Sequence, residues 1–229
     1  MITAALAWYD EPTENLTKLV LSLDGIASNL VALDGRWDLM PGDTTNSPDE
    51  QAAEIDARCR EIGLPLALYR VEQPWDSQVA KRSALMHLAR TLGRQPWAMI
   101  IDGDEYISQA NPPELHRALA HTEADVCQVL GQRHGNGMRP SSRPIRRLYR
   151  SSTGVTIRYA HNGYVTADGR WLHGDPAYVR LEKPADLSDH LAITNHVRSR
   201  SPRRNEHAQT YHHARARTKT EQWPRGLKP

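Results

Sequence analysis

Apolar and polar residues alternate along the first 130 positions in a way that predicts strands and helices in turn. Short apolar runs predict strands at residues 2–8, 29–34, 64–71, 97–102 and 124–131. Amphipathic segments predict helices between them, at residues 13–23, 47–63, 76–93 and 111–122. Strands that alternate with helices are typical of βαβ units and a mostly parallel sheet, so we expect an α/β fold.

Two of the predicted helices begin with capping signals. Ser47 is expected to be the N-cap of the second helix, with Pro48 in its first turn and Glu50 closing a capping box. Asn111 is expected to cap the fourth helix.

After Gly131 the pattern changes to shorter units. Strands separated by turns are predicted at residues 143–151, 154–160, 163–167, 170–174 and 177–181. Ser201 would cap a last, basic helix over residues 202–217, followed by a loose tail. With 229 residues, one domain is the simplest expectation.

The surroundings of the chain can also be predicted. No apolar run approaches the roughly 18 residues of a membrane span, and the N-terminus lacks the basic region of a signal peptide. Cys59 and Cys127 have no metal-binding spacing, which favours a reducing, cytoplasmic setting.

Charge divides the chain into two unlike halves. Residues 1–130 carry 10 Lys/Arg and 20 Asp/Glu, a net charge of −10, whereas residues 131–229 carry 19 and 7, a net charge of +12. Such an asymmetry indicates either two halves with different partners or two halves that attract each other within one fold.

The fourth predicted strand, in "WAMIIDGDEYI", ends in three acidic residues, Asp102, Asp104 and Glu105. Carboxylates this close repel one another unless a cation or hydrogen bonds compensate. Asp-Gly is also a common turn dipeptide. At the carboxyl end of a strand in an α/β half, however, D-x-D offers the hard oxygen ligands that suit Mg²⁺ or Mn²⁺.

The order of these features resembles a GT-A fold glycosyltransferase, especially members related to glycosyltransferase family two. The likeness rests on five stretches: "WYDEP", the strand ending in Asp34, "SPDEQAAEI", "PWDSQVAKRSALMHLA" and the D-x-D-E of "WAMIIDGDEYI". It covers residues 1–130 and, weakly, "LAITNHVRS". The loop after Asp34 lacks the family's D-x-x-S-x-D spacing, and Lys81-Arg82-Ser83 replaces its Arg-Asn pair.

The resemblance implies a GT-A type, Rossmann-like, mostly parallel sheet flanked by helices. Residues 1–130 would form the nucleotide-sugar-binding half, and residues 131–229 the basic acceptor-binding half of the same domain. The implied activity is a divalent-metal-dependent glycosyl transfer with Mn²⁺ or Mg²⁺ and a nucleotide-sugar donor, expected to be a UDP-sugar. A nucleotidyltransferase and a non-catalytic nucleic-acid-binding module are the alternatives.

The resemblance also implies roles for individual residues at the donor site. The residues that would border the base and ribose are Trp8, Asp10, Glu11 and Asp34. Those that would face the diphosphate or bind the metal ion are Lys81, Arg82, Asp104 and His196, while Asp102 would contact the ribose or a metal-bound water. Asp104 is the expected metal ligand, with His196 as a further one. Trp8 could equally be a core aromatic, and Lys81 and Arg82 could belong to a solvated helix face.

An inverting transfer needs a base to accept the acceptor's proton. The candidates are His161, Asp168, Asp175 and Asp189. Asp168 is preferred, with His161 second, because carboxylates usually fill this role in related enzymes. An ordinary Asp-Gly turn at Asp168, or a retaining mechanism without this base, is the alternative.

Arginine dominates the second half, with seven between residues 133 and 158 and no acidic residue among them. Clustered arginines interleaved with tyrosines fit a polyanionic partner. The acceptor-binding residues are predicted to be Arg143, Arg146, Arg147, Arg203 and Arg204. We therefore expect an anionic acceptor, in its sharpest form DNA that carries a hydroxylated base; an acidic lipid surface or a phosphorylated small acceptor would use similar residues.

Overall fold

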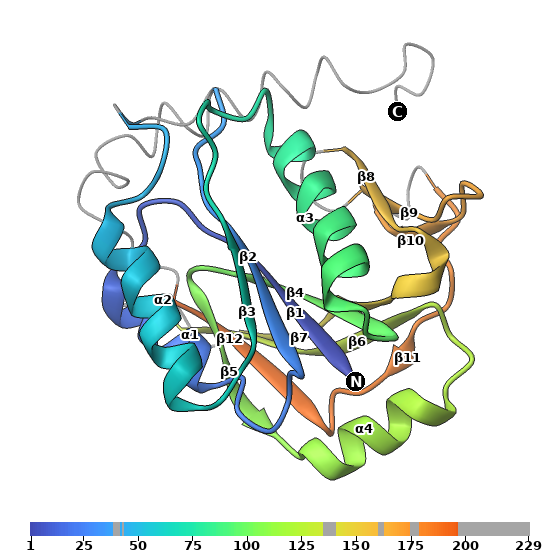
Figure 1. The fold of residues 1–229 in the computed structure, drawn as a ribbon. Helices are drawn as coiled ribbons and strands as arrows, with labels where there is room; N and C mark the ends of the chain where they lie inside the picture. Colours follow the sequence, from blue (N-terminus) through green and yellow to red (C-terminus); the bar gives the residue numbers. More distant parts are fainter. Residues whose placement is uncertain (39–41, 43, 135–140, 160–162, 175–178, 197–229) are drawn as a thin grey trace.

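The computed structural model describes residues 1–38, 42, 44–134, 141–159, 163–174 and 179–196. For residues 133, 134, 159 and 196 it describes the backbone only. The chain forms a large curled sheet with helices on both faces and a smaller sheet beside it (Figure 1).

Among the described residues, the large sheet has nine strands in the order β3-β2-β1-β4-β7-β6-β12-β5, with β11 paired to β6. Its parallel core is β1 (Ile2–Ala7), β2 (Asn29–Leu33), β3 (Leu66–Tyr69) and β4 (Trp97–Asp102). The remaining strands are β5 (Glu105–Ala110), β6 (Val126–His134), β7 (Ser141–Arg150), β11 (Ala185–Asp186) and β12 (Leu191–His196). Because β7 runs antiparallel to both β4 and β6, the sheet is mostly but not wholly parallel, as predicted.

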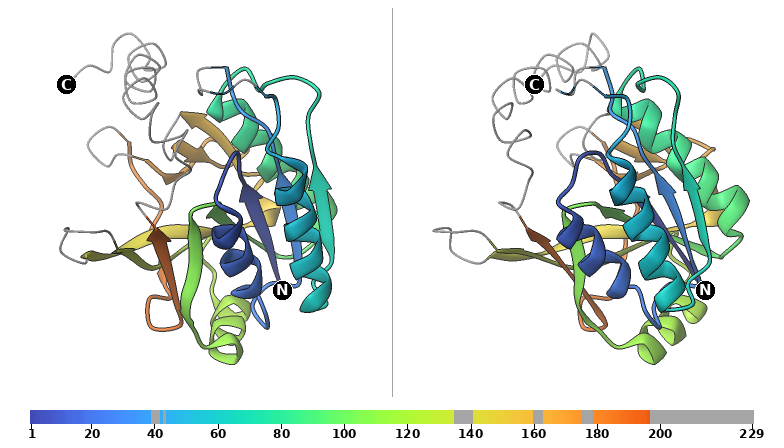
Figure 2. Two further views of the ribbon diagram at one scale, coloured as in Figure 1. Left: turned by 90° about the vertical axis from the view of Figure 1, so that its left-hand side faces the viewer. Right: turned by 60° about the vertical axis from the view of Figure 1, so that its left-hand side comes forward.

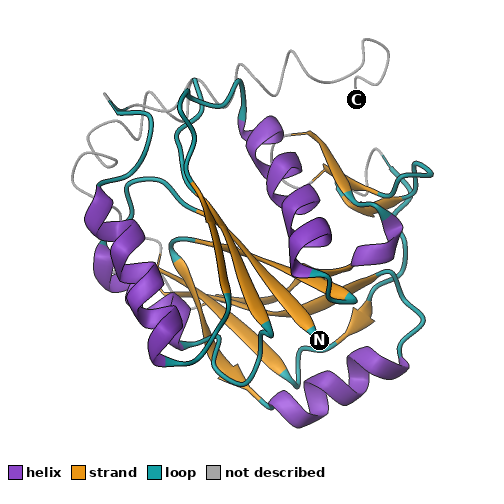
Figure 3. Cartoon of the chain, in the orientation of Figure 1, coloured by secondary structure: helices purple, strands orange, loops and turns teal. Residues whose placement is uncertain are grey.

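Helices cover both faces of this sheet (Figures 2 and 3). The helices are α1 (Thr13–Leu21), α2 (Asp49–Glu61), α3 (Gln78–Gly93) and α4 (Pro112–His121). Helices α1 and α2 pack side by side on one face, and α3 lies on the other, next to the small sheet. The small antiparallel sheet is formed by β8 (Thr156–Tyr159), β9 (Gly163–Val165) and β10 (Trp171–His173), with a short 3₁₀ turn, η1 (Ser151–Thr153), before it.

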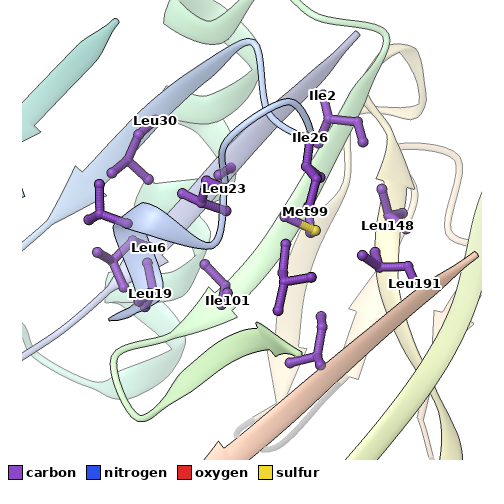
Figure 4. Close-up of a cluster of buried hydrophobic side chains, with 14 of the residues drawn as sticks. Ile2, Leu6, Leu19, Leu23, Ile26, Leu30, Met99, Ile101, Leu148 and Leu191 are labelled. Atoms are coloured by element: carbon purple, nitrogen blue, oxygen red, sulfur yellow. The ribbon is translucent and has the colours of Figure 1, made fainter. Parts of the chain in front are cut away.

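The core follows from the alternation of side chains along the central strands. In β1, Ala4 and Leu6 point to the α1 side, while Ala5 points to the α3 side. The α1-side cluster, shown in Figure 4, includes Leu6, Leu19, Leu23 and Leu30. A strand buried on both faces has an almost continuous apolar sequence, which is why these strands were predictable.

Three strands, β5, β11 and β12, were missed, and two predictions lie partly or wholly beyond the described residues. β5 begins directly after the acidic turn and pairs antiparallel with β12, but its sequence "EYISQA" has only a weak alternation. Of residues 177–181, Leu181 forms an isolated bridge with Trp171. The predicted helix at residues 202–217 lies outside the described residues. In the described part of the chain, no helix has the length and apolar character needed to cross a bilayer.

Candidate functional site

The central parallel strands end at one level of the sheet. Ala7 at the end of β1 lies beside Leu33 of β2 and beside Asp102 of β4. The loops that follow these strands therefore meet at one edge, which is where open α/β sheets bind their ligands.

The acidic turn packs directly on the loop between β1 and α1. A side chain at Gly103 would place its Cβ 2.6 Å from Cγ of Glu11 and 3.2 Å from Cβ of Trp8, so only glycine allows this approach. Glu11 and Asp104 are both buried there. The fold thus brings together the loops that follow β1 and β4.

Two arginines hold the carboxylate of Asp102. Nη2 of Arg82, from α3, lies 2.5 Å from Oδ1, and Nη1 of Arg147, from β7, lies 3.8 Å from Oδ2. Arg147 also donates to Oε1 of Glu105, whose Oε2 accepts the backbone N–H of Asp102 at 3.0 Å. Glu105 therefore fixes the shape of the turn, and Arg147 joins β7 to it.

Burial is the main influence on Glu105, and it raises the pKa of this carboxyl to about 7. Asp102 and Asp104 raise this pKa further through repulsion, while the guanidinium of Arg147 lowers it. The charge of the Glu105 carboxyl thus depends on its ion pair with Arg147.

Behind the two arginines lies an aromatic stack that sequence reasoning missed. The ring of Tyr164 stacks with Tyr149, at 4.7 Å between centroids, and with His173, at 5.7 Å. The Tyr149 hydroxyl lies 3.1 Å from Nδ1 of His173, and the Tyr164 hydroxyl accepts from Arg82 at 3.3 Å. Burial, and then the surrounding arginines, lowers the pKa of His173 to about 3, so this imidazole is neutral near pH 7.

Asp34 is fully buried and is surrounded by donors. Its carboxylate accepts the Gly35 N–H at 2.7 Å and the hydroxyl and backbone N–H of Ser47 at 2.6 and 3.0 Å. Nε of Arg70 is a fourth donor, at 3.3 Å. Asp34 thus anchors the segment before α2 to the end of β2.

The expected capping role of Ser47 is wrong. Pro48 occupies the N-cap of α2, and no side chain caps that helix. Ser47 instead binds Asp34 and accepts the backbone N–H of Asp10 at 3.0 Å, which ties the loop after β1 to the end of β2. Asn111, by contrast, caps α4 as predicted, accepting from the Glu114 N–H.

Lys81 and Trp8 are placed inside the fold. Nζ of Lys81 donates to the carbonyl oxygens of Trp8 and Gly35, each at 2.6 Å, and so joins the loops after β1 and β2. Its side chain is buried, and burial lowers the pKa of this amine to about 7. The Trp8 ring belongs to the α1-side core.

Asp168 lies at the opposite end of the sheet from Asp102. It is exposed and bound to Thr166 and Arg170 in the turn between β9 and β10. Arg170 pairs with Asp125, immediately before β6, and the neighbouring Ala167 N–H binds Thr153, close to where β4 begins. The structure therefore does not bring Asp168 to the acidic turn.

The other base candidates are not brought together with the turn in the described structure. Asp189 lies in the turn before β12. His161 and Asp175 fall outside the described residues.

The predicted acceptor-binding arginines occupy different places. Arg143 is exposed on β7, Arg146 donates to the Leu172 carbonyl, and Arg147 belongs to the acidic turn. Arg203 and Arg204 lie outside the described residues.

His196 ends β12, and only its backbone is described. The preceding residue, Asn195, pairs with Glu105 in the sheet, so the end of β12 lies beside the acidic turn.

The chemistry of the turn fits a divalent cation bound together with a substrate. In the described part of the chain, no group of three or more His, Cys, Asp or Glu side chains is arranged to hold a metal ion. Mg²⁺, however, usually takes one or two carboxylates and completes its shell with water and substrate phosphates. Within the turn, Asp104 is the buried carboxylate that the resemblance assigned to this role.

Comparison with known proteins places the fold but gives no family by sequence. No family model matches the chain, and neither does any curated protein. The structure is similar to S. aureus TarS 1-349 in complex with UDP-GlcNAc, with a TM-score of 0.53, 17% identity, and coverage of 85% of this chain and 58% of that one. It is also similar to S. aureus TarS, with a TM-score of 0.51, 14% identity, and coverage of 86% and 36%.

A weaker likeness involves a putative glucose-1-phosphate thymidylyltransferase from Bacillus anthracis. Its TM-score is 0.45 at 11% identity, with 67% of this chain and 72% of that one covered. The chain spans about half the length of the TarS 1-349 structures that it matches. The fold is GT-A-like, as the sequence led us to expect.

Proposed function

We propose that the protein is a glycosyltransferase that moves a sugar from a nucleotide-sugar donor to an acceptor hydroxyl, with Mn²⁺ or Mg²⁺. One observation carries the proposal: at the ligand-binding edge of a GT-A-like fold, the Asp102–Glu105 turn is pressed onto the β1–α1 loop beside Arg82 and Arg147. A similar fold was solved with UDP-GlcNAc, which supports a nucleotide-sugar as the donor.

In the proposed reaction the bond between the anomeric carbon and the diphosphate oxygen breaks, and its electron pair stays with the diphosphate. The acceptor oxygen bonds to the anomeric carbon and loses its proton to a base. A divalent cation, when bound, supplies positive charge to the leaving diphosphate, and Asp104 would hold it. Arg82 supplies further positive charge from the protein itself.

The chain's own residues shape the nucleoside side of the site. Asp34, Ser47 and Lys81 lock the loops after β1 and β2 to each other through hydrogen bonds to backbone groups. We assign these residues to positioning, and Asp10 and Glu11, on the loop so fixed, to the border of the base and ribose. Such rigid support is what preorganises a binding site.

We further propose an anionic acceptor, in its sharpest form DNA with a hydroxylated base. Arg143 is exposed at the start of β7, and residues 191–229 carry nine Lys/Arg against two Glu in the sequence. Binding to a polyanion through such residues weakens steeply with salt. DNA affinity that stays level between low and high salt, or no transfer to modified DNA, would count against this acceptor.

The test is a panel of nucleotide-sugars incubated with the protein and Mn²⁺ or EDTA, with release of nucleoside diphosphate as the readout. We expect one donor to be turned over with Mn²⁺ and not with EDTA. Asp104→Ala should lose turnover and keep its fold, whereas a non-catalytic binding module would keep its function. Release of pyrophosphate from a nucleoside triphosphate, without diphosphate release, would show a nucleotidyltransferase instead.

A further inference from the structure

Arg147 and Arg82 meet at one carboxylate although they come from distant parts of the chain. Arg82 lies on α3 and Arg147 on β7, yet their guanidinium groups lie on the two oxygens of Asp102, at 2.5 and 3.8 Å. Both side chains are largely buried, with 17% and 15% of their surface exposed. Burying two like charges this close costs free energy unless nearby groups compensate.

The two arginines are matched in charge within the protein, but their described contacts do not use all of their N–H donors. Asp102 and Glu105 match the two arginines in charge, and both carboxylates lie at the edge where a ligand is expected. A guanidinium has five N–H donors, and the described contacts of Arg147 use only Nη1 and Nη2. Each arginine can therefore bind a phosphate oxygen without leaving its carboxylate partner.

Beyond Asp102, the described side-chain partner of Arg82 is a neutral group and not a further carboxylate. The Tyr164 hydroxyl accepts from Arg82, and the Tyr164 ring stacks with both Tyr149 and His173. His173 is neutral because burial and the neighbouring arginines disfavour its charged form. Such contacts orient a cation without cancelling its charge, which is the arrangement expected where negative charge develops during a reaction.

We propose that Arg147 acts with Arg82 as a two-arginine clamp on the diphosphate of the donor, so that Arg147 belongs to the donor site and not to the acceptor surface. This inference rests on the proposed function and assigns its leaving-group site. Paired guanidinium groups suit phosphate oxygens because they offer parallel N–H donors in a fixed geometry.

The experiment compares Glu105→Gln with Glu105→Gln/Arg147→Gln, because removing Arg147 alone would leave Glu105 buried beside two aspartates. Titration calorimetry with Mn²⁺ measures binding of UDP and UMP, and of GDP and GMP. Loss of Arg147 is expected to weaken the diphosphate about 10- to 100-fold and the monophosphate less than about 3-fold. Arg158→Gln, an exposed arginine on β8, is the matched control and should leave both affinities unchanged.

Equal effects on diphosphate and monophosphate, or no effect on either, would overturn the clamp while leaving the proposed function in place. A wild-type protein that binds none of these diphosphates would instead overturn the proposed function, and the clamp with it. Thermal melts of both variants check that the comparison is made between folded proteins.

Discussion

The two halves of the chain contribute to the acidic turn in different ways. The first half supplies the carboxylates, and Gly103 lets their turn pack on the β1–α1 loop. Ser47 and Lys81 tie that loop to the end of β2. The second half supplies charge and aromatic packing through β7, which enters the sheet between β4 and β6 and carries Arg147 to the turn. Part of the opposite charge of the two halves is thus matched inside the fold, and need not all signal a partner.

The largest effect is expected from Asp104→Asn, which tests the contribution of the first half. Removing the proposed metal ligand should lower the rate of sugar transfer by at least about 10²-fold, because a metal ion stabilises the charge that develops in the transition state by several kcal/mol. Turnover with saturating donor, measured across a Mn²⁺ titration, checks this. Turnover close to wild type at low Mn²⁺ would remove Asp104 from the metal site.

The next effect concerns the junction of the halves. Asp102→Asn removes the shared partner of Arg82 and Arg147 and should lower the free energy of unfolding by about 2 kcal/mol, somewhat less than for a fully buried pair. Urea denaturation measures the change. The double variant Asp102→Asn/Arg82→Gln should recover part of the loss; if it does not, the two arginines do not depend on this carboxylate.

A smaller effect, dependent on pH, is expected from the aromatic stack of the second half. His173 has its pKa lowered from 6.5 to about 3 in the folded protein, so between these values the unfolded chain binds the extra proton. The associated stability is present above about pH 6.5 and is lost as pH falls toward 3. Between about pH 7 and about pH 4, the wild type should lose more free energy of unfolding than His173→Gln. Parallel pH profiles would contradict this account.

The smallest effect is expected from Asp168→Asn, at the far end of the sheet. Because Asp168 is exposed and paired with Arg170, the variant should change turnover less than about 2-fold. If Asp168 were the general base, the variant would lose about 10²-fold or more in turnover, and that result would show that Asp168 is a catalytic residue. Steady-state rates near neutral pH decide between the two.

The sequence allowed the parallel half and its acidic turn to be predicted, since buried strands and the D-x-D pattern are local signals. It could not show that Ser47 binds Asp34, because its spacing to Glu50 is also that of a capping box. Nor could it show which arginines of β7 are surface and which internal. Arg143 and Arg147 lie in the same run, and only the pairing of β7 with β4 and the nearby Glu105 separates them.

The position of a bound nucleotide tests the central claim most directly. We predict that a crystal structure with UDP and Mn²⁺ will show the ion on Asp104 and the diphosphate within hydrogen-bond distance of Arg82 and Arg147, at the edge where β1 and β4 end. A nucleotide bound away from this edge, or an ion that Asp104 does not contact, would contradict the account.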